Sequence, residues 1–285
     1  MTTNNSFESF WLTVNGLQIR AYALGNGKPL LLLHGGGVDG ALLSWRLAMP
    51  ALAAASRRVI AFDWPGYGES QPNPQPNTMD FYIDFTGAVM DALGLQRSGL
   101  MGLSLGGGAA LGFALAHPER VERLALVDAY GLADKVAFQR LSHAMVQADW
   151  IMLGSYKLLR KSRALTKWTL SYLLVRKESI TDELVDEVYR VICDPEAGKA
   201  FLDIQRSDVL PDRVRTCYMD RIHELAMPTL IIHGEKDQLV PLAAAREAVR
   251  RNPAIQLAVL PRCGHWPQRD APDEFNRAAA EFLTD

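Results

Sequence analysis

The 285-residue chain has little cysteine, no excess of charge of one sign and no long apolar run. Its three cysteines, Cys193, Cys217 and Cys263, are too few and too scattered for a disulfide framework or a zinc site, which suits a reducing compartment. The 30 Lys and Arg residues nearly balance the 32 Asp and Glu residues, so no basic excess indicates a nucleic-acid partner. No stretch approaches the ~18 consecutive apolar residues of a membrane-spanning helix, and the polar N-terminus lacks a signal-peptide pattern. We therefore expect a cytoplasmic protein with neither a membrane nor a nucleic-acid partner.

Hydrophobic residues make up 48% of the chain, enough to bury a sizeable core. Continuous apolar runs indicate strands that are buried on both faces, as in a parallel sheet. These runs lie at residues 30–33, 59–62, 99–103, 124–127, 229–232 and 255–260. Helical periodicity separates them, at residues 79–93, 105–117, 243–251 and 272–283. The Asn15-Gly16 pair predicts a leading hairpin, which would add antiparallel strands at one edge of an α/β sheet.

The alternation of strands and helices stops between Gly131 and Ala226 and restarts after Pro228. The intervening segment has helical character throughout. We therefore predict that residues 1–130 and 226–285 form one α/β core, and that residues 131–225 form a helical cap inserted into it. Aromatic residues of this segment are expected to pack the cap: Trp150, Trp168 and Tyr172.

The motif most indicative of chemistry is Gly102-Leu103-Ser104-Leu105-Gly106, between a predicted strand and a predicted helix. This is the strand–turn–helix context of a G-x-S-x-G nucleophile elbow, in which glycines allow strand and helix to approach closely. Ser104 also lies where a helix N-terminus offers backbone N–H groups to an anion. An ordinary glycine-rich turn and a phosphate-binding loop are the alternatives for this motif alone.

A serine nucleophile needs a base, and the base needs a carboxylate to orient it. Asp237 and His265 each follow a predicted strand and therefore lie at the sheet edge that presents Ser104. The order Ser104, Asp237, His265 is the order that accompanies this elbow. Asp128, at the end of another strand, is the alternative acid, whereas His34 is expected to structure its loop.

These motifs, with His34-Gly35-Gly36-Gly37 and the 63–70 segment, resemble the α/β-hydrolase superfamily over nearly the whole chain. The resemblance implies a mostly parallel sheet of about eight strands with Ser104 as nucleophile, Asp237 as orienting acid and His265 as general base. It also implies an oxyanion hole made by the backbone N–H groups of Leu105 and Gly36. The neighbours Gly35 and Gly37 are the alternatives to Gly36, and with Trp266 they are expected to line the substrate pocket.

Within that superfamily the chain is similar to the carbon–carbon hydrolases of aromatic meta-cleavage products in the glycines after His34, in Gly264-His265-Trp266 with the later Glu274-Phe275-Asn276, and in the 180–184 segment. It departs from them at the substrate-binding positions. Leu103 replaces the asparagine common before their nucleophile, and the asparagine expected after the oxyanion loop is replaced near Ser44. Val188 stands where their cap carries an arginine that holds the substrate carboxylate. Arg190 and Arg206 are the candidates for a substitute.

We therefore expect a serine hydrolase that acts on a small to medium, mostly apolar carboxylic ester. The alternatives are carbon–carbon hydrolysis of a vinylogous diketone acid and, from another class, a non-catalytic small-ligand binding protein on the same fold. No metal-ligand spacing or nucleotide motif is present, so neither a metal nor another cofactor is expected. The chain could act alone or as a homo-oligomer.

Overall fold

The computed structural model describes residues 7–136 and 138–284. Its strands form one eight-stranded sheet. They are β1 (Glu8–Val14), β2 (Leu17–Leu24), β3 (Lys28–Leu33), β4 (Arg57–Phe62), β5 (Ser98–Leu103), β6 (Val121–Val127), β7 (Thr229–Gly234) and β8 (Gln256–Leu260). The order across the sheet is β1-β2-β4-β3-β5-β6-β7-β8. Strands β3 to β8 pair in parallel, and the hairpin β1–β2 adds antiparallel strands beside β4, as predicted.

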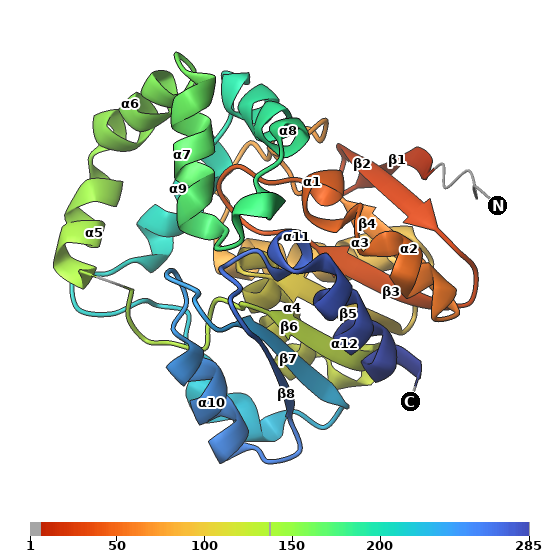
Figure 1. Cartoon of the computed structure of the whole chain (residues 1–285). Helices are drawn as coiled ribbons and strands as arrows, with labels where there is room; N and C mark the ends of the chain where they lie inside the picture. The colour runs from red at the N-terminus through yellow and green to blue at the C-terminus, as the bar shows by residue number, and fades with distance from the viewer. Residues whose placement is uncertain (1–6, 137, 285) are drawn as a thin grey trace.

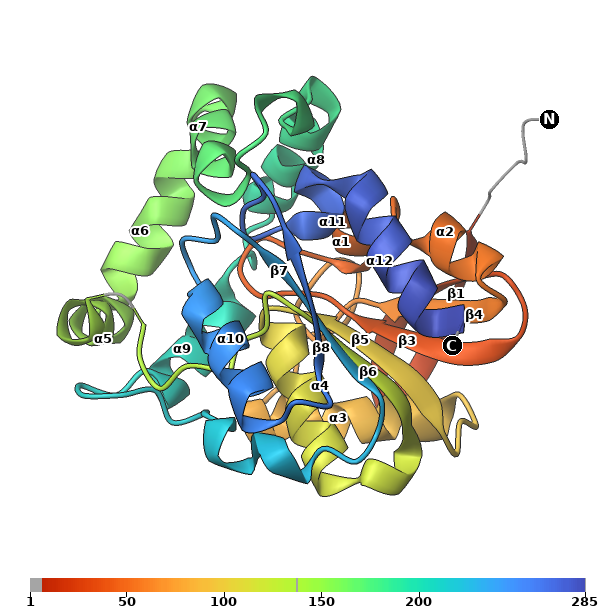
Figure 2. The ribbon, with the colours of Figure 1, turned by 60° about the horizontal axis from the view of Figure 1, so that its bottom comes forward.

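The helices that accompany the sheet are α1 (Ala41–Trp45), α2 (Met49–Ala54), α3 (Met79–Ala92), α4 (Leu105–Ala116), α10 (Leu242–Arg251), α11 (Pro267–Asp270) and α12 (Pro272–Thr284). The 3-10 turns η1 (Pro118–Arg120) and η3 (Met219–Glu224) precede β6 and β7. Figures 1 and 2 show the helices distributed over both faces of the sheet. The periodicity analysis did not predict α1, α2 and α11, because helices of four to six residues are too short to establish a period.

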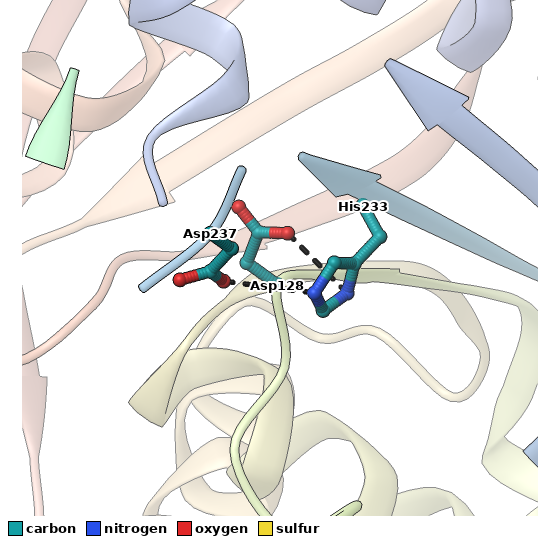
Figure 3. A group of neighbouring side chains, drawn as sticks. All are labelled: Asp128, His233 and Asp237. Atoms are coloured by element: carbon teal, nitrogen blue, oxygen red, sulfur yellow. Dashed lines mark ion pairs between the residues drawn. The ribbon is translucent and has the colours of Figure 1, made fainter. Parts of the chain in front are cut away.

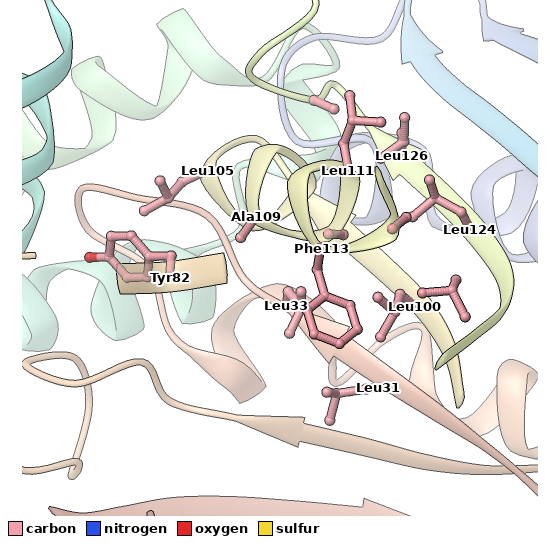
Figure 4. Packing of buried hydrophobic residues seen from close by; sticks show 14 of the residues in the cluster. Leu31, Leu33, Tyr82, Leu100, Leu105, Ala109, Leu111, Phe113, Leu124 and Leu126 are labelled. Carbon is pink, nitrogen blue, oxygen red and sulfur yellow. The ribbon is translucent and has the colours of Figure 1, made fainter. Parts of the chain in front are cut away.

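Two hydrophobic layers explain why the strand sequences are apolar without alternation. On β3, Leu31 and Leu33 point into the layer that contains α3 and α4, whereas Leu30 and Leu32 point into the layer that contains α1, α2 and α12. Successive side chains of a strand alternate between faces, so a strand covered on both sides is apolar at every position. Figure 4 shows the first layer, where Phe113 of α4 approaches Leu33 and Leu100. Both faces of the central strands are therefore buried.

The segment between β6 and β7 is helical, with α5 (Gln139–Gln147), α6 (Asp149–Leu159), α7 (Arg163–Leu173), η2 (Lys177–Ser179), α8 (Asp182–Cys193) and α9 (Lys199–Asp208). Figure 1 shows these helices grouped at one end of the sheet. The inner face of α8, with Leu184 and Val188, packs into the same layer as α12. No helix in the described ranges has the length and apolar character required to cross a membrane.

The prediction that aromatic residues pack this helical segment was wrong for three side chains. Trp150 and Trp168 are 78% and 70% exposed, and Tyr172 is 51% exposed. Smaller residues such as Leu170 and Val185 fill the helical interface instead. When both faces of a helix carry large apolar residues, sequence periodicity does not tell which face is buried.

Candidate active site

Ser104 occupies a strained turn between β5 and α4. Its φ of +48° and ψ of −114° lie outside the regions that L-residues usually adopt. A Cβ on Gly102 would lie 2.3 Å from the carbonyl oxygen of Gly106, and a Cβ on Gly106 would lie 2.3 Å from that of Leu33. Only glycine fits at these two positions, so the sequence motif and the observed turn have the same physical cause.

Asp237 and His265 meet through a hydrogen bond between the histidine Nδ1 and the carboxylate Oδ2, 2.8 Å apart. The other oxygen of Asp237 accepts the backbone N–H groups of Leu239 at 2.7 Å and Val240 at 3.1 Å. The backbone N–H of His265 donates to the carbonyl of Leu173 at 2.9 Å, so the end of α7 helps to fix the histidine loop. This bonding holds the imidazole plane and favours the tautomer in which Nε2 is free to accept a proton.

Ser104 and His265 face the same space, because both line the same two cavities. Among the described residues, the His265 imidazole forms one side-chain hydrogen bond, to Asp237. The Ser104 hydroxyl forms none to it in this structure. Hydrogen bonds between nucleophile and base often shorten only when a substrate is bound. The structure thus brings the three predicted residues to one edge of the sheet.

The loop after β3 is shaped by two buried side chains. The Nε2 atom of His34 accepts a hydrogen bond from the backbone N–H of Trp64 at 3.0 Å, and its Nδ1 lies 2.8 Å from the Gly35 carbonyl oxygen. Burial lowers the pKa of His34 to about 3, so this histidine stays neutral and structural. Asp39 accepts the backbone N–H of Gly35 at 2.7 Å.

The bond to Asp39 removes one of the candidate oxyanion donors. It occupies the Gly35 N–H, so Gly35 does not serve as the alternative to Gly36. The N–H groups of Gly36 and Leu105 form no backbone hydrogen bond within the described residues. Leu105 is the first residue of α4, where an N–H has no partner inside the helix. The N–H of Gly37 likewise forms no backbone hydrogen bond to a described residue, so Gly36 and Gly37 both stay candidates to act with Leu105.

Two cavities of about 280 Å³ and 290 Å³ share four lining residues: Ser104, Phe201, Leu239 and His265. The larger one follows the oxyanion loop and contains Gly36 together with the three predicted pocket residues, Gly35, Gly37 and Trp266. The other is lined by residues of α5 and α9, and the polar side chains of Tyr130, Gln205 and Asp208 belong to its lining. A substrate that spans both cavities would place its reacting bond beside Ser104.

Phe201 on α9 was not anticipated from the sequence, although it touches the centre of the site. A Cβ on Gly36 would lie 2.3 Å from Cδ2 of its ring, so the ring packs directly on the oxyanion loop. Phe201 lies in a helix far along the chain, and no local motif marks its contact with Gly36. Tyr156 lines the same cavity and was also missed.

Cap arginines do not reach the two cavities. Val188 lines the cavity beside the oxyanion loop, whereas Arg190 is exposed, and Arg206 donates to the Val146 carbonyl at 3.1 Å outside both linings. Trp266 donates its indole N–H to Ser44 Oγ at 3.2 Å, and Ser44 in turn donates to Asp39. Neither candidate arginine is therefore placed to meet a bound substrate.

Comparison with known proteins agrees with this architecture. The sequence model of the alpha/beta hydrolase fold matches residues 28–272. A 2-hydroxymuconate semialdehyde hydrolase from Pseudomonas sp. (strain CF600) is 31% identical over 95% of this chain and 92% of its own. A 2-hydroxy-6-oxononadienedioate/2-hydroxy-6-oxononatrienedioate hydrolase from Comamonas testosteroni is 33% identical over 98% of both chains.

The solved structures include a meta-cleavage product hydrolase from Pseudomonas fluorescens IP01, a serine-to-alanine mutant complexed with acetates. It superposes with a TM-score of 0.79 at 29% identity, over 96% of this chain and 97% of its own. The chain belongs to the α/β-hydrolase family and is related to its meta-cleavage product hydrolases. It is a hydrolase.

Proposed function

We propose that this hydrolase cleaves a carbon–carbon bond next to a ketone in a small-molecule substrate, with Ser104, Asp237 and His265 as its catalytic residues. The observation that carries the proposal is similarity over nearly the whole chain to hydrolases of meta-cleavage products. The 2.8 Å bond between His265 and Asp237 and the position of Ser104 between two cavities support the chemistry. The proposal replaces the ester hydrolase expected from the sequence as the leading function.

The mechanism follows from the positions of these groups. His265 Nε2 takes the Ser104 proton as the hydroxyl oxygen adds to the ketone carbon, and the N–H groups of Gly36 and Leu105 hold the resulting oxyanion. When the carbon–carbon bond breaks, its electron pair passes to the leaving fragment, where a neighbouring carbonyl stabilises it as an enolate. His265 returns the proton to that fragment. Water activated by the same imidazole then hydrolyses the ester on Ser104.

A second candidate, hydrolysis of uncharged esters, is favoured by the charge of the cavities. Among the described lining residues there is no lysine or arginine, and the acidic ones are Asp39 and Asp208. A substrate carboxylate would therefore lose its hydration without gaining a cationic partner. The same lining accepts an apolar acyl group.

Side-by-side kinetics separate the two functions. The substrates are a vinylogous 1,5-diketone that carries a carboxylate, the same diketone without it, and p-nitrophenyl butyrate. The proposal predicts carbon–carbon cleavage products with kcat/KM at least about tenfold above that of the ester, and a preference for the uncharged diketone. Ester turnover with no cleavage of either diketone would contradict it and establish the second candidate.

A further inference from the structure

Behind Asp237 lies a second pair of buried residues that the mechanism does not use. Asp128 follows β6 and His233 lies on β7, and both side chains are completely buried (Figure 3). His233 Nδ1 is 3.3 Å from Asp128 Oδ1, and His233 Nε2 is 3.6 Å from Asp237 Oδ2. The ligand-type atoms of all three side chains lie within 4.8 Å of one another. Because two buried negative charges side by side are costly, the protonation state of each group in this cluster matters for its stability.

The hydrogen bonds of His233 determine where its own proton lies. Nε2 is 3.0 Å from the backbone carbonyl of Val240, and a carbonyl only accepts, so Nε2 carries the hydrogen. In a neutral imidazole Nδ1 then has a bare lone pair, which faces the Asp128 carboxyl oxygen. Two lone pairs at this separation repel each other. His233 Nδ1 has no hydrogen-bond partner among the described residues, and one proton placed between it and Asp128 Oδ1 removes the repulsion.

The surroundings of Asp128 favour the carboxyl side for that proton. One oxygen accepts the Gly234 N–H at 2.9 Å, and the other is buried with no partner among the described residues. Burial first, and then the charge of Asp237, raise the pKa of Asp128 well above its ordinary value. Burial lowers the pKa of His233. Both directions describe a neutral acid that faces a neutral imidazole.

We propose that Asp128 and His233 share one proton as a net-neutral pair that positions Asp237 for His265. The inference rests on the proposed catalytic roles of Asp237 and His265. His233 holds the Val240 carbonyl, and the N–H of Val240 donates to Asp237, so the pair fixes the turn that carries the acid.

Because the pair carries no net charge, Asp237 supplies the negative charge that stabilises the imidazolium. Asp270 is the other carboxyl group whose charge acts on Asp128. Its oxygens accept backbone N–H groups of Val175, Arg176 and Gly264. It is therefore committed to holding the cap and the histidine loop. Asp128 and His233 are positioning residues, since neither lines the cavities at Ser104.

Asparagine at position 128 provides the sharpest test. An amide NH2 at the position of Oδ1 donates to His233 Nδ1 and gives up the bond from the Gly234 N–H, because Oδ1 makes both contacts. Asparagine also tolerates the φ of +41° observed there. The measurement is the rate of covalent labelling by a fluorophosphonate between pH 5 and 9, which requires no knowledge of the natural substrate. Asp128→Asn should label within about threefold of the wild type, with an unchanged acidic limb of the pH profile. Asp128→Ala, which removes the carboxyl group that faces His233 Nδ1, should label about tenfold more slowly.

Asp237→Asn is the matched control, and it should label about 10³-fold more slowly, because the same substitution there removes the working charge. If Asp128→Asn behaved like Asp237→Asn, Asp128 would be acting as an ionised acid and the proposal would be overturned. A shift of the acidic limb to lower pH in Asp128→Asn would also overturn it, since loss of an unshared negative charge lowers the pKa of a nearby histidine. If EDTA abolished labelling and Zn²⁺ restored it, a metal ion would lie where the proposal places the shared proton, and the proposal would be overturned. Failure of the wild type to label would instead contradict the proposed function.

Discussion

Asp39 holds Gly35, because the aspartate Oδ2 accepts the glycine N–H at 2.7 Å, and the next residue, Gly36, lines the cavity beside Ser104. The same carboxyl group accepts from the Gly40 N–H at 2.7 Å and from the Ser44 hydroxyl. The oxyanion loop is therefore shaped from behind by a buried acid. No motif in the sequence marks this role.

The ionisation of Asp39 should make stability depend on pH. Burial raises the pKa of Asp39 to about 7, from 3.8. Between these values the folded chain holds a proton that the unfolded chain releases, so the contribution of Asp39 to stability falls as the pH rises from about 4 to 7. The size is on the order of 1.4 kcal/mol for each unit of pKa difference.

Urea unfolding of the wild type and Asp39→Asn at pH 5, 6, 7 and 8 measures this contribution. The free energy of unfolding of the wild type should fall relative to that of the variant as the pH rises. A constant difference across the series would show that Asp39 does not titrate in this range.

Gly36→Ala should lower kcat/KM by about 100-fold or more, because the new Cβ would lie 2.3 Å from the Phe201 ring and displace an oxyanion donor. Phe201→Ala in the same chain removes the clash and should restore part of the loss. Gly154→Ala, with nothing within 4 Å of the new Cβ, is the control and should leave turnover unchanged. Steady-state kinetics on all four proteins make the comparison, and a loss that Phe201→Ala does not relieve would contradict this explanation.

A substitution at Val188, which lines the cavity beside the oxyanion loop, can change the charge of that cavity. Val188→Arg introduces a cation into the lining and should lower the KM for a substrate carboxylate by about tenfold, with little effect on an uncharged analogue. Arg190→Ala, at an exposed position on the same helix, should change neither value. An equal effect of both variants on the two substrates would mean that the carboxylate binds elsewhere.

The bond between Tyr130 and Asp208 connects the loop after β6 to α9. Thr216 also donates to Asp208, at 2.6 Å, so Tyr130→Phe leaves the buried carboxylate with fewer donors. We expect a loss of about 1–2 kcal/mol in the free energy of unfolding. Urea denaturation measures it. Tyr172→Phe, at a half-exposed position in the same cavity, serves as control and should be nearly neutral.

The sheet and the position of Ser104 could be predicted because local physics determines them. Strands buried on both faces are apolar at every position, as Leu30 and Leu31 show, and the elbow requires glycine at fixed distances from Ser104. The contact of Phe201 with Gly36 depends on how α9 docks, and helical periodicity does not encode docking. The protonation of the Asp128–His233 pair likewise depends on burial, which only the folded chain defines.

Covalent labelling of the nucleophile tests the central claim most directly. A fluorophosphonate probe is incubated with the wild type, Ser104→Ala and His265→Ala, and the modified residue is located by mass spectrometry of peptides. The account predicts one adduct, on Ser104, that is absent from Ser104→Ala and forms at least about 10³-fold more slowly in His265→Ala. An adduct on another residue, or equal rates with and without His265, would contradict it.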